Sequence, residues 1–124
     1  MEKKYMEKVF YLEACDINPD GSLKSYVGNG DQVIVMGLAN YCGYCTKAKP
    51  DFENFAKQSN NTICCAILSD GDPTEKQASN FFRMWDKNHR GVPTYIGFDK
   101  NGKFKSIHTG GRDVKSLLEF SNTL

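Results

Sequence analysis

Two seven-residue segments, 32–38 and 62–68, are almost continuously apolar and rich in β-branched residues. A short run of this kind is typical of a strand covered on both faces, as in a parallel sheet. Between them, five apolar side chains recur at the spacing of one helix face: Cys45, Ala48, Phe52, Phe55 and Ala56. We expect this helix to run from Thr46 to about Asn60, with a kink at Pro50. A strand, a helix and a second strand in succession predict an α/β sheet.

The rest of the N-terminal two thirds predicts shorter elements of the same kind. We expect a strand at 9–13 and a short helix that starts from a capping Ser22 and ends at Val27. Asp72-Pro73-Thr74-Glu75 begins another helix with a cap residue, a proline at the first helical position and a capping-box acid. This helix carries the apolar side chains of Ala78, Phe81, Phe82 and Trp85.

The C-terminal third predicts a hairpin and a last helix. Strands at 95–98 and 104–108 flank the turn sequence Asp99-Lys100-Asn101-Gly102. Gly110-Gly111 interrupts the chain, and a helix follows from about Asp113. It directs apolar side chains toward the core: Val114, Leu117, Leu118 and Phe120. The resulting order, β-α-β-α-β-α-β-β-α, predicts a sheet with helices on both faces.

The composition is that of an ordinary globular protein. Because 124 residues supply one core and too few side chains for two, we expect a single domain over 1–124. The net charge of +1 provides no basic surface for nucleic acid. The segment Met1–Lys8 is charged and lacks a signal-peptide core, and no apolar run is long enough for a membrane helix. We therefore expect a cytoplasmic protein without nucleic-acid or membrane partners.

The five cysteines are an odd number, which disfavours a disulfide-stapled secreted domain. Cys42 and Cys45 lie where the strand 32–38 gives way to the helix, so Cys42 stands near the helix N-terminus and Cys45 one turn later. Unpaired N–H groups and the helix dipole favour a thiolate there. The pair therefore predicts redox chemistry in which Cys42 attacks a disulfide and the more buried Cys45 resolves the product.

The cysteine pair has two other interpretations, a zinc site and an inert structural pair. A zinc site would need a second pair of ligands, whereas the adjacent Cys64 and Cys65 should point to opposite faces of a strand, and His89 and His108 stand alone. An inert structural pair is the other interpretation. Cys64 and Cys65 are expected to be packing residues, and Cys15, at a strand end, is expected to be more exposed.

On these residues the chain resembles the thioredoxin superfamily over nearly its whole length. The resemblance rests on the strand before Cys42-Gly43-Tyr44-Cys45, on Pro50, on Val92-Pro93-Thr94 before the hairpin, and on Gly110 after it. It implies a thioredoxin fold with a central mixed sheet. It also implies a protein thiol–disulfide oxidoreductase without metal or organic cofactor, whose redox group is the Cys42–Cys45 disulfide. Its partners would be protein disulfides or dithiols and an unidentified reductase or oxidase.

The same resemblance implies how a substrate would bind. A cis peptide bond before Pro93 would lie beside the cysteines, and Val92 would offer free backbone groups to an extended substrate segment. The implied substrate-binding residues are Tyr41, Gly43, Tyr44, Val92, Pro93 and Gly110.

Several residues depart from typical thioredoxins. Met36, six residues before Cys42, occupies the position of a buried acid, and Ala66 replaces an expected lysine. Tyr41 replaces a tryptophan, and Tyr44 replaces the proline between the cysteines. Because that acid is thought to deprotonate the resolving cysteine, its absence predicts slower resolution or the use of another base.

The segment Gly110-Gly111-Arg112-Asp113 leaves an alternative open. It resembles the motif that holds glutathione in glutaredoxins, which implies a glutathione-linked reductase with Arg112 and Asp113 holding the tripeptide. The other interpretation is a strand-to-helix breaker with Asp113 at the helix start. A further alternative is a non-enzymatic thioredoxin-fold module that binds a partner protein.

Overall fold

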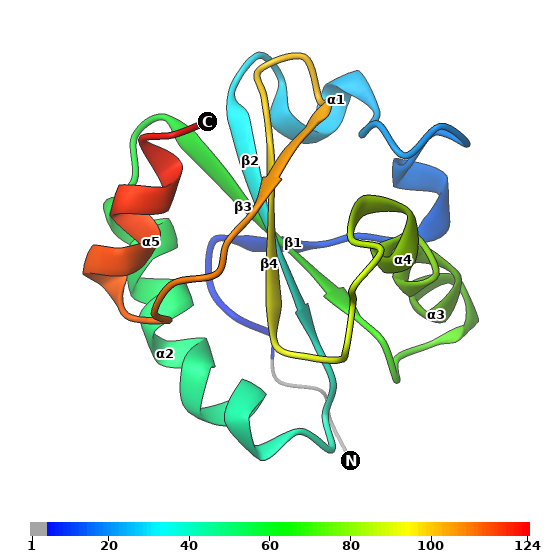
Figure 1. Cartoon of the computed structure of the whole chain (residues 1–124), viewed down its shortest axis with the longest axis horizontal. Coiled ribbons are helices and arrows are strands. Elements are labelled where there is room, and N and C mark those ends of the chain that lie inside the picture. The colour runs from blue at the N-terminus through cyan, green and yellow to red at the C-terminus, as the bar shows by residue number, and fades with distance from the viewer. Residues whose placement is uncertain (1–4) are drawn as a thin grey trace.

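A mixed five-stranded sheet forms the centre of the computed structural model, which describes residues 5–124 (Figure 1). Its strands, in spatial order, are β1 (Val9–Tyr11), β3 (Thr62–Leu68), β2 (Gln32–Leu38), β4 (Thr94–Phe98) and β5 (Phe104–Ile107). The first three are parallel, and β4 and β5 are antiparallel to their neighbours. The predicted cellular location rests on the charged segment Met1–Lys8, and residues 1–4 of it lie outside the described residues.

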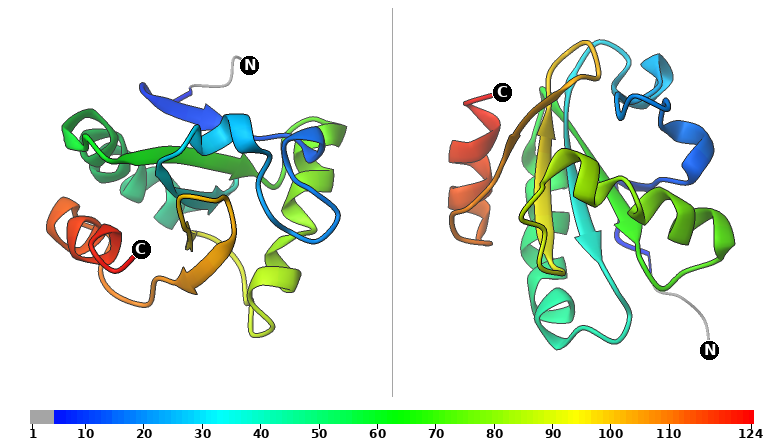
Figure 2. Two further views of the ribbon diagram at one scale, coloured as in Figure 1. Left: turned by 90° about the horizontal axis from the view of Figure 1, so that it is seen from above. Right: turned by 45° about the vertical axis from the view of Figure 1, so that its right-hand side comes forward.

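Helices cover both faces of the sheet (Figure 2). They are α1 (Ser25–Gly28), α2 (Gly43–Gln58), α3 (Pro73–Ser79), α4 (Phe82–Trp85) and α5 (Val114–Ser121), with a short 3₁₀ turn, η1 (Ala14–Asp16). Helices α2 and α5 lie on one face, and α1, α3 and α4 lie on the other. No helix among residues 5–124 combines the length and apolar composition needed to cross a bilayer.

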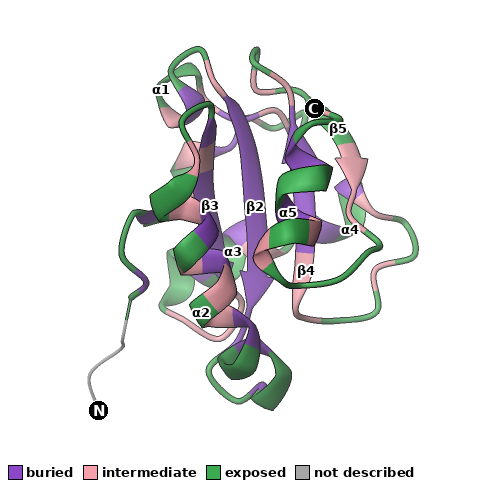
Figure 3. Cartoon of the chain, turned by 90° about the vertical axis from the view of Figure 1, so that its left-hand side faces the viewer, coloured by how far each residue is buried: buried purple, intermediate pink, exposed green. Residues whose placement is uncertain are grey.

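Strand β2 is buried along its whole length (Figure 3). Because successive side chains of a strand point to opposite faces, Ile34 and Met36 pack with α2 and α5, whereas Val33 and Val35 pack with α3 and α4. The predicted bounds of β2 and β3 agree with the structure residue for residue. Continuous apolar runs were the reliable signal here, since a strand covered on both faces has no polar side.

Two predicted helices differ from the structure. The first begins at Ser25 because the backbone N–H of Leu23 donates to the Gly102 carbonyl at 2.8 Å, and the Ser22 hydroxyl bonds Asp20 rather than capping. The helix after Asp72 is broken in two. At Phe81 the backbone N–H bonds three residues back, to Ala78, which tightens the turn and separates α3 from α4.

Smaller differences lie at other element ends. The first strand stops at Tyr11 because Glu13 caps η1, and its backbone N–H bonds the Asp16 carboxylate at 2.8 Å. On α5, Leu118 is exposed, contrary to expectation, because Leu117 and Phe120 occupy the face that meets the sheet. The capping box at the start of α3 is confirmed. Pro50 lies inside α2, and its kink stays a prediction.

Candidate active site

Cys42 is the N-cap residue of α2, four residues beyond the end of β2. Its sulfur accepts the backbone N–H of Cys45, with 3.1 Å between nitrogen and sulfur. An N–H directed at the sulfur stabilises a thiolate more than a thiol, as does the positive end of the helix dipole. Cys42 is 9% exposed and Cys45 is 0% exposed, and both are free thiols. The relative burial predicted for the pair is therefore confirmed.

An aspartate holds the loop that precedes the cysteines. Both carboxylate oxygens of Asp70 accept the backbone N–H of Asn40, at 2.9 and 3.0 Å, and one also accepts that of Tyr41 at 3.3 Å. Asp70 follows β3, and the carboxyl ends of the neighbouring parallel strands meet at this edge. Sequence reasoning missed this role, although an acid directly after the second apolar run was a usable signal.

The Val92–Pro93 peptide bond is cis and lies against the first cysteine. The Cys42 thiol donates to the carbonyl oxygen of Val92 across 3.6 Å. Residue 42 follows β2 and residue 92 precedes β4, and because these two strands are antiparallel neighbours, both residues lie at the same end of the sheet. The Val92 carbonyl therefore lies next to the Cys42 sulfur.

The other predicted substrate-binding residues divide into two groups. Tyr41, Gly43 and Tyr44 are exposed around Cys42, and Tyr41 lines a pocket together with Val92. Gly110 lines a separate hollow beside α5, with His108, Ser116 and Glu119 as neighbours. The structure therefore joins Tyr41 to Val92 in one concave surface but does not bring Gly110 into it.

Burial raises the pKa of the Cys45 thiol to about 12, and the hydrogen bond to Cys42 and the charge of Cys42 act in the same direction. A backbone hydrogen bond at Ala39 and the charge of Arg112 oppose this rise. Met36 is fully buried in the core cluster that contains Cys45, and Ala66 lies directly opposite it on β3. The Cys45 thiol is therefore held neutral in apolar surroundings.

The raised pKa of Cys45 predicts a pH-dependent resolution step. Because the fraction of thiolate grows about tenfold per pH unit below the pKa, release of a mixed disulfide should accelerate about tenfold per unit between about pH 6 and about pH 9. Release of thionitrobenzoate from an adduct formed on Cys42 measures this rate, and Cys45→Ser, which lacks the thiol, is the control. Release that does not vary with pH would contradict the prediction.

The remaining cysteines lie outside this site. Burial raises the pKa of Cys64 to about 12 and raises that of Cys65 as well. They face opposite sides of the sheet, in the two different core clusters, so their predicted packing role is confirmed. Cys15 is exposed, as expected. Within residues 5–124, no group of three His, Cys, Asp or Glu side chains is arranged to hold a metal ion.

The residues around Gly111 favour the helix-start interpretation. Asp113 is the N-cap residue of α5, and hydrogen bonding by Ser116, three residues further on, lowers the pKa of its carboxyl. Arg112 lies over the Tyr44 ring, with 5.8 Å from the guanidinium carbon to the ring centroid, within cation–π range. Arg112 therefore brings positive charge to the helix that carries the cysteines, a role that its sequence context did not reveal.

Tyr95 carries a buried hydroxyl with no hydrogen-bond partner among the described residues. It stands opposite Met36 on β4, and its ring packs 5.7 Å from that of Phe52. Burial raises the pKa of this phenol, so it stays protonated at neutral pH. An unpaired buried hydroxyl costs free energy because it has lost its hydration without compensation.

Tyr95→Phe is expected to increase the free energy of unfolding by about 1 kcal/mol, since it removes this unpaired group. Urea denaturation measures the change. The matched control is Tyr26→Phe, whose hydroxyl donates to the Asp16 carboxylate at 2.7 Å on the surface. Tyr26→Phe should show no increase in the free energy of unfolding. A clear loss of stability in Tyr95→Phe would show that the hydroxyl has a stabilising partner.

The chain matches a known protein family over most of its length. The profile of the family described as "Thioredoxin-like domain" matches residues 19–121. The chain therefore belongs to the thioredoxin superfamily, a family of thiol–disulfide oxidoreductases. The predicted fold class, a thioredoxin fold with a mixed sheet flanked by helices, is confirmed.

Individual relatives agree with this assignment. The chain is 28% identical to a thioredoxin-like protein of Invertebrate iridescent virus 6 over 133 aligned residues, with 96% of each chain covered. It is 32% identical to protein disulfide-isomerase 1 of Dictyostelium discoideum, covering 86% of this chain but 28% of that protein. Spinach chloroplast thioredoxin F has the same fold, with a TM-score of 0.66, 19% identity, and 98% and 97% of the two chains covered.

Proposed function

We propose that the protein is a thiol–disulfide oxidoreductase that acts on protein disulfides or dithiols, with Cys42 as nucleophile and Cys45 as resolving cysteine. The observation that carries this proposal is the environment of the Cys42 sulfur. It accepts the Cys45 backbone N–H at 3.1 Å at the N-cap of α2 and lies 3.6 Å from the Val92 carbonyl. The nucleophilic sulfur thus receives a backbone N–H at a helix N-terminus and lies beside the Val92 backbone, along which an extended substrate segment would bind.

The reaction proceeds by two exchange steps. The Cys42 thiolate attacks one substrate sulfur, a Cys42–substrate disulfide forms, and the other substrate sulfur leaves as a thiolate. Cys45 then loses its proton to solvent and attacks the Cys42 sulfur, so that the Cys42–Cys45 disulfide forms and the second substrate thiolate leaves. Two electrons pass from the cysteine pair to the substrate, and no metal or organic cofactor takes part.

The same two exchange steps in reverse oxidise a substrate dithiol. Which direction prevails depends on the reduction potential of the Cys42–Cys45 pair and on the reductase or oxidase that recycles it. Equilibration of the pair against glutathione buffers measures that potential. A value near about −270 mV is typical of thioredoxin, and one near about −120 mV is typical of a strong oxidant.

The substrate-binding surface is proposed around the first cysteine. Tyr41, Gly43 and Tyr44 would contact the substrate beside the attacked sulfur, and Val92 and Pro93 would contact its backbone. Support comes from the exposure of the first three and from the short approach of Val92 to Cys42. Gly110 belongs to this proposal only as a more distant contact, since it lines a separate hollow.

Cys45→Ser is the experiment that tests this assignment of roles. With a protein disulfide such as that of insulin, the variant should accumulate a covalent Cys42–substrate adduct and lose turnover, because its serine cannot resolve the adduct. Mass spectrometry and insulin reduction measure the two effects. Cys15→Ser, a change at an exposed cysteine outside the site, should behave as the wild type does.

The same variant separates the proposed function from a glutathione-linked one. A glutaredoxin-type reductase would keep its activity in a glutathione-coupled assay after Cys45→Ser, because external glutathione can resolve the adduct. Retained activity in that assay would favour the glutathione-linked alternative. Loss of activity in both assays supports the two-cysteine mechanism.

A further inference from the structure

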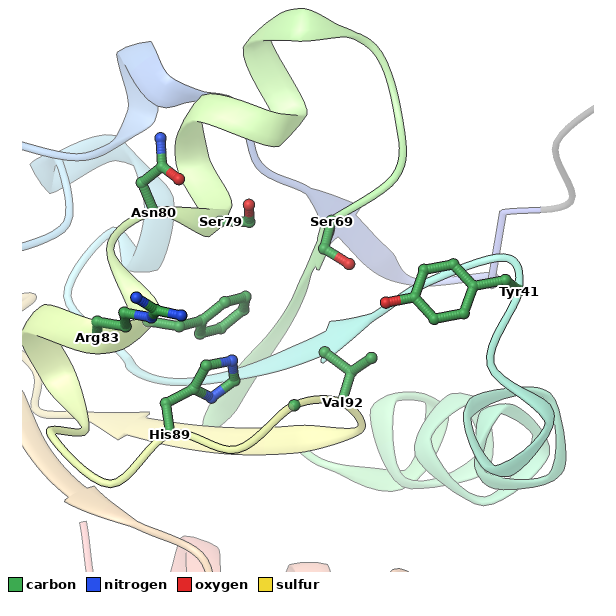
Figure 4. Close-up of a pocket in the computed structure, with 9 residues that line it drawn as sticks. Tyr41, Ser69, Ser79, Asn80, Arg83, His89 and Val92 are labelled. Carbon is green, nitrogen blue, oxygen red and sulfur yellow. The ribbon is translucent and has the colours of Figure 1, made fainter.

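A pocket of about 430 Å³ opens beside the attacking cysteine (Figure 4). We call it the Arg83–His89 pocket. The residues that matter for its chemistry are Tyr41, Ser69, Asn80, Arg83, His89 and Val92. Figure 4 shows Arg83 and His89 on one side, and Tyr41 on the opposite side with its hydroxyl directed inward. Its volume is within the range of ligand-binding cavities.

The charge of the pocket has one sign. Arg83 supplies a permanent positive charge, His89 a titratable imidazole, and no acidic residue is among those that line it. Asp70 is the nearest acid in sequence, next to Ser69, but its carboxylate accepts the backbone N–H groups of residues 40 and 41. An anionic group is therefore the ligand that this lining favours.

The hydrogen-bond donors of the pocket also point to an incoming acceptor. The Ser69 hydroxyl already donates to the Leu38 carbonyl at 3.1 Å. Within residues 5–124, by contrast, the structure has no protein acceptor for the Arg83 guanidinium, the Asn80 amide, the His89 ring or the Tyr41 hydroxyl. These donors are mostly exposed to solvent, so a ligand with several acceptor oxygens can bind them in place of water, and a carboxylate pairs well with a planar guanidinium.

Packing holds one wall of the pocket in place. The His89 ring stacks on Phe82, with centroids 5.2 Å apart and an angle of 21° between planes. The backbone N–H of His89 donates to the Asp86 carbonyl at 3.0 Å. Arg83 belongs to α4, which Trp85 anchors through its indole N–H to the Gly21 carbonyl at 2.8 Å. The His89 ring and the backbone that carries Arg83 are therefore held in place by packing.

The position of the pocket connects it with the exchange reaction. Two of its lining residues, Tyr41 and Val92, flank Cys42, one in sequence and one through the 3.6 Å contact with the Val92 carbonyl. A substrate segment extended along Val92 advances about 3.3 Å per residue. A side chain close in sequence to the substrate cysteine would therefore lie near the pocket while the sulfur faces Cys42.

We propose that the Arg83–His89 pocket is a specificity subsite that binds a carboxylate side chain of the substrate protein, close in sequence to its reactive cysteine. This inference rests on the proposed function, because it identifies the substrate class of that reaction. It adds no step to the exchange chemistry. It increases the rate of attack by holding the substrate sulfur near Cys42.

The test uses two peptides that differ in one residue. Each contains one cysteine in a mixed disulfide with 2-mercaptoethanol, and Glu or Gln lies three residues away. Reduced wild-type protein should react with the Glu peptide about tenfold faster than with the Gln peptide, the value of one charge-assisted hydrogen bond. Dividing each rate by that of dithiothreitol with the same peptide removes the intrinsic effect of the charge on the disulfide.

Two arginine variants test whether the preference for the Glu peptide arises in the pocket. Arg83→Gln should bring the Glu-to-Gln rate ratio down to about one, since the variant lacks the pairing charge. Arg90→Gln is the matched control, because Arg90 is exposed, carries the same charge and does not line the pocket. It should keep the full ratio. An equal loss of preference in both variants would mean long-range attraction and would overturn the subsite.

The outcomes distinguish the subsite from the underlying function. Equal rates with both peptides in the wild type overturn the subsite and leave the oxidoreductase function standing. Failure to reduce either peptide overturns the oxidoreductase function, and the subsite with it. Glutathione disulfide and its neutral ethyl ester form a further arm. If the preference that depends on Arg83 appears there and not with the peptides, the carboxylate belongs to glutathione and the substrate-protein proposal is wrong.

Discussion

Cys42→Ser is expected to lower the rate of protein disulfide reduction by about 10³-fold or more, because the hydroxyl of serine does not ionise at neutral pH and is a poor nucleophile toward sulfur. The N-cap position and the Cys45 N–H at 3.1 Å favour negative charge at residue 42. This effect is too small to ionise a serine hydroxyl at neutral pH, so the variant stays inactive. Insulin reduction with a dithiol as electron donor measures the loss.

The control for this prediction is Cys64→Ser, a change at a buried cysteine that shares the same core cluster but lies on β3. It should reduce stability without removing activity from the folded protein. If Cys42→Ser retained both insulin reduction and cellular function, the enzyme assignment would be wrong. The fold would then serve as a partner-binding module, the non-enzymatic alternative.

Met36→Asp is expected to accelerate release of the mixed disulfide by about 10²-fold at neutral pH, the usual contribution of a positioned general base. Met36 is fully buried and belongs to the same core cluster as Cys45, whose pKa is raised to about 12. A carboxylate there can accept the thiol proton before attack. The release rate of thionitrobenzoate from the Cys42 adduct measures the effect.

The same substitution should lower the free energy of unfolding by about 3 kcal/mol, since it buries a polar group and leaves a cavity in the core. Met36→Asn is the matched control, because it brings a similar loss of stability without a base. Its release rate should stay at the wild-type value. Equal rates in the Asp and Asn variants would contradict the idea that a missing acid limits resolution.

Sequence reasoning predicted the features that follow from local patterns and missed one that depends on packing. The strands β2 and β3 and the position of Cys42 at a helix start follow from local patterns, since a fully buried strand must be apolar throughout. The capping box before α3 is likewise a local signal. The break between α3 and α4 was missed, because it depends on how Phe82 and Trp85 pack against the sheet and not on any breaking residue.

The sequence by itself determined the order of elements, the superfamily and the cysteine pair, because apolar periodicity and turn residues act within a few positions along the chain. The family resemblance had placed Val92 beside the cysteines, whereas only the tertiary structure showed the contacts of Asp70 and the Arg83–His89 pocket. Val92, Asp70 and the Arg83–His89 pocket come from segments far apart in the chain, and long-range pairing of the strands brings them to one edge of the sheet. Substrate preference, as proposed here, depends on that convergence, which no local pattern encodes.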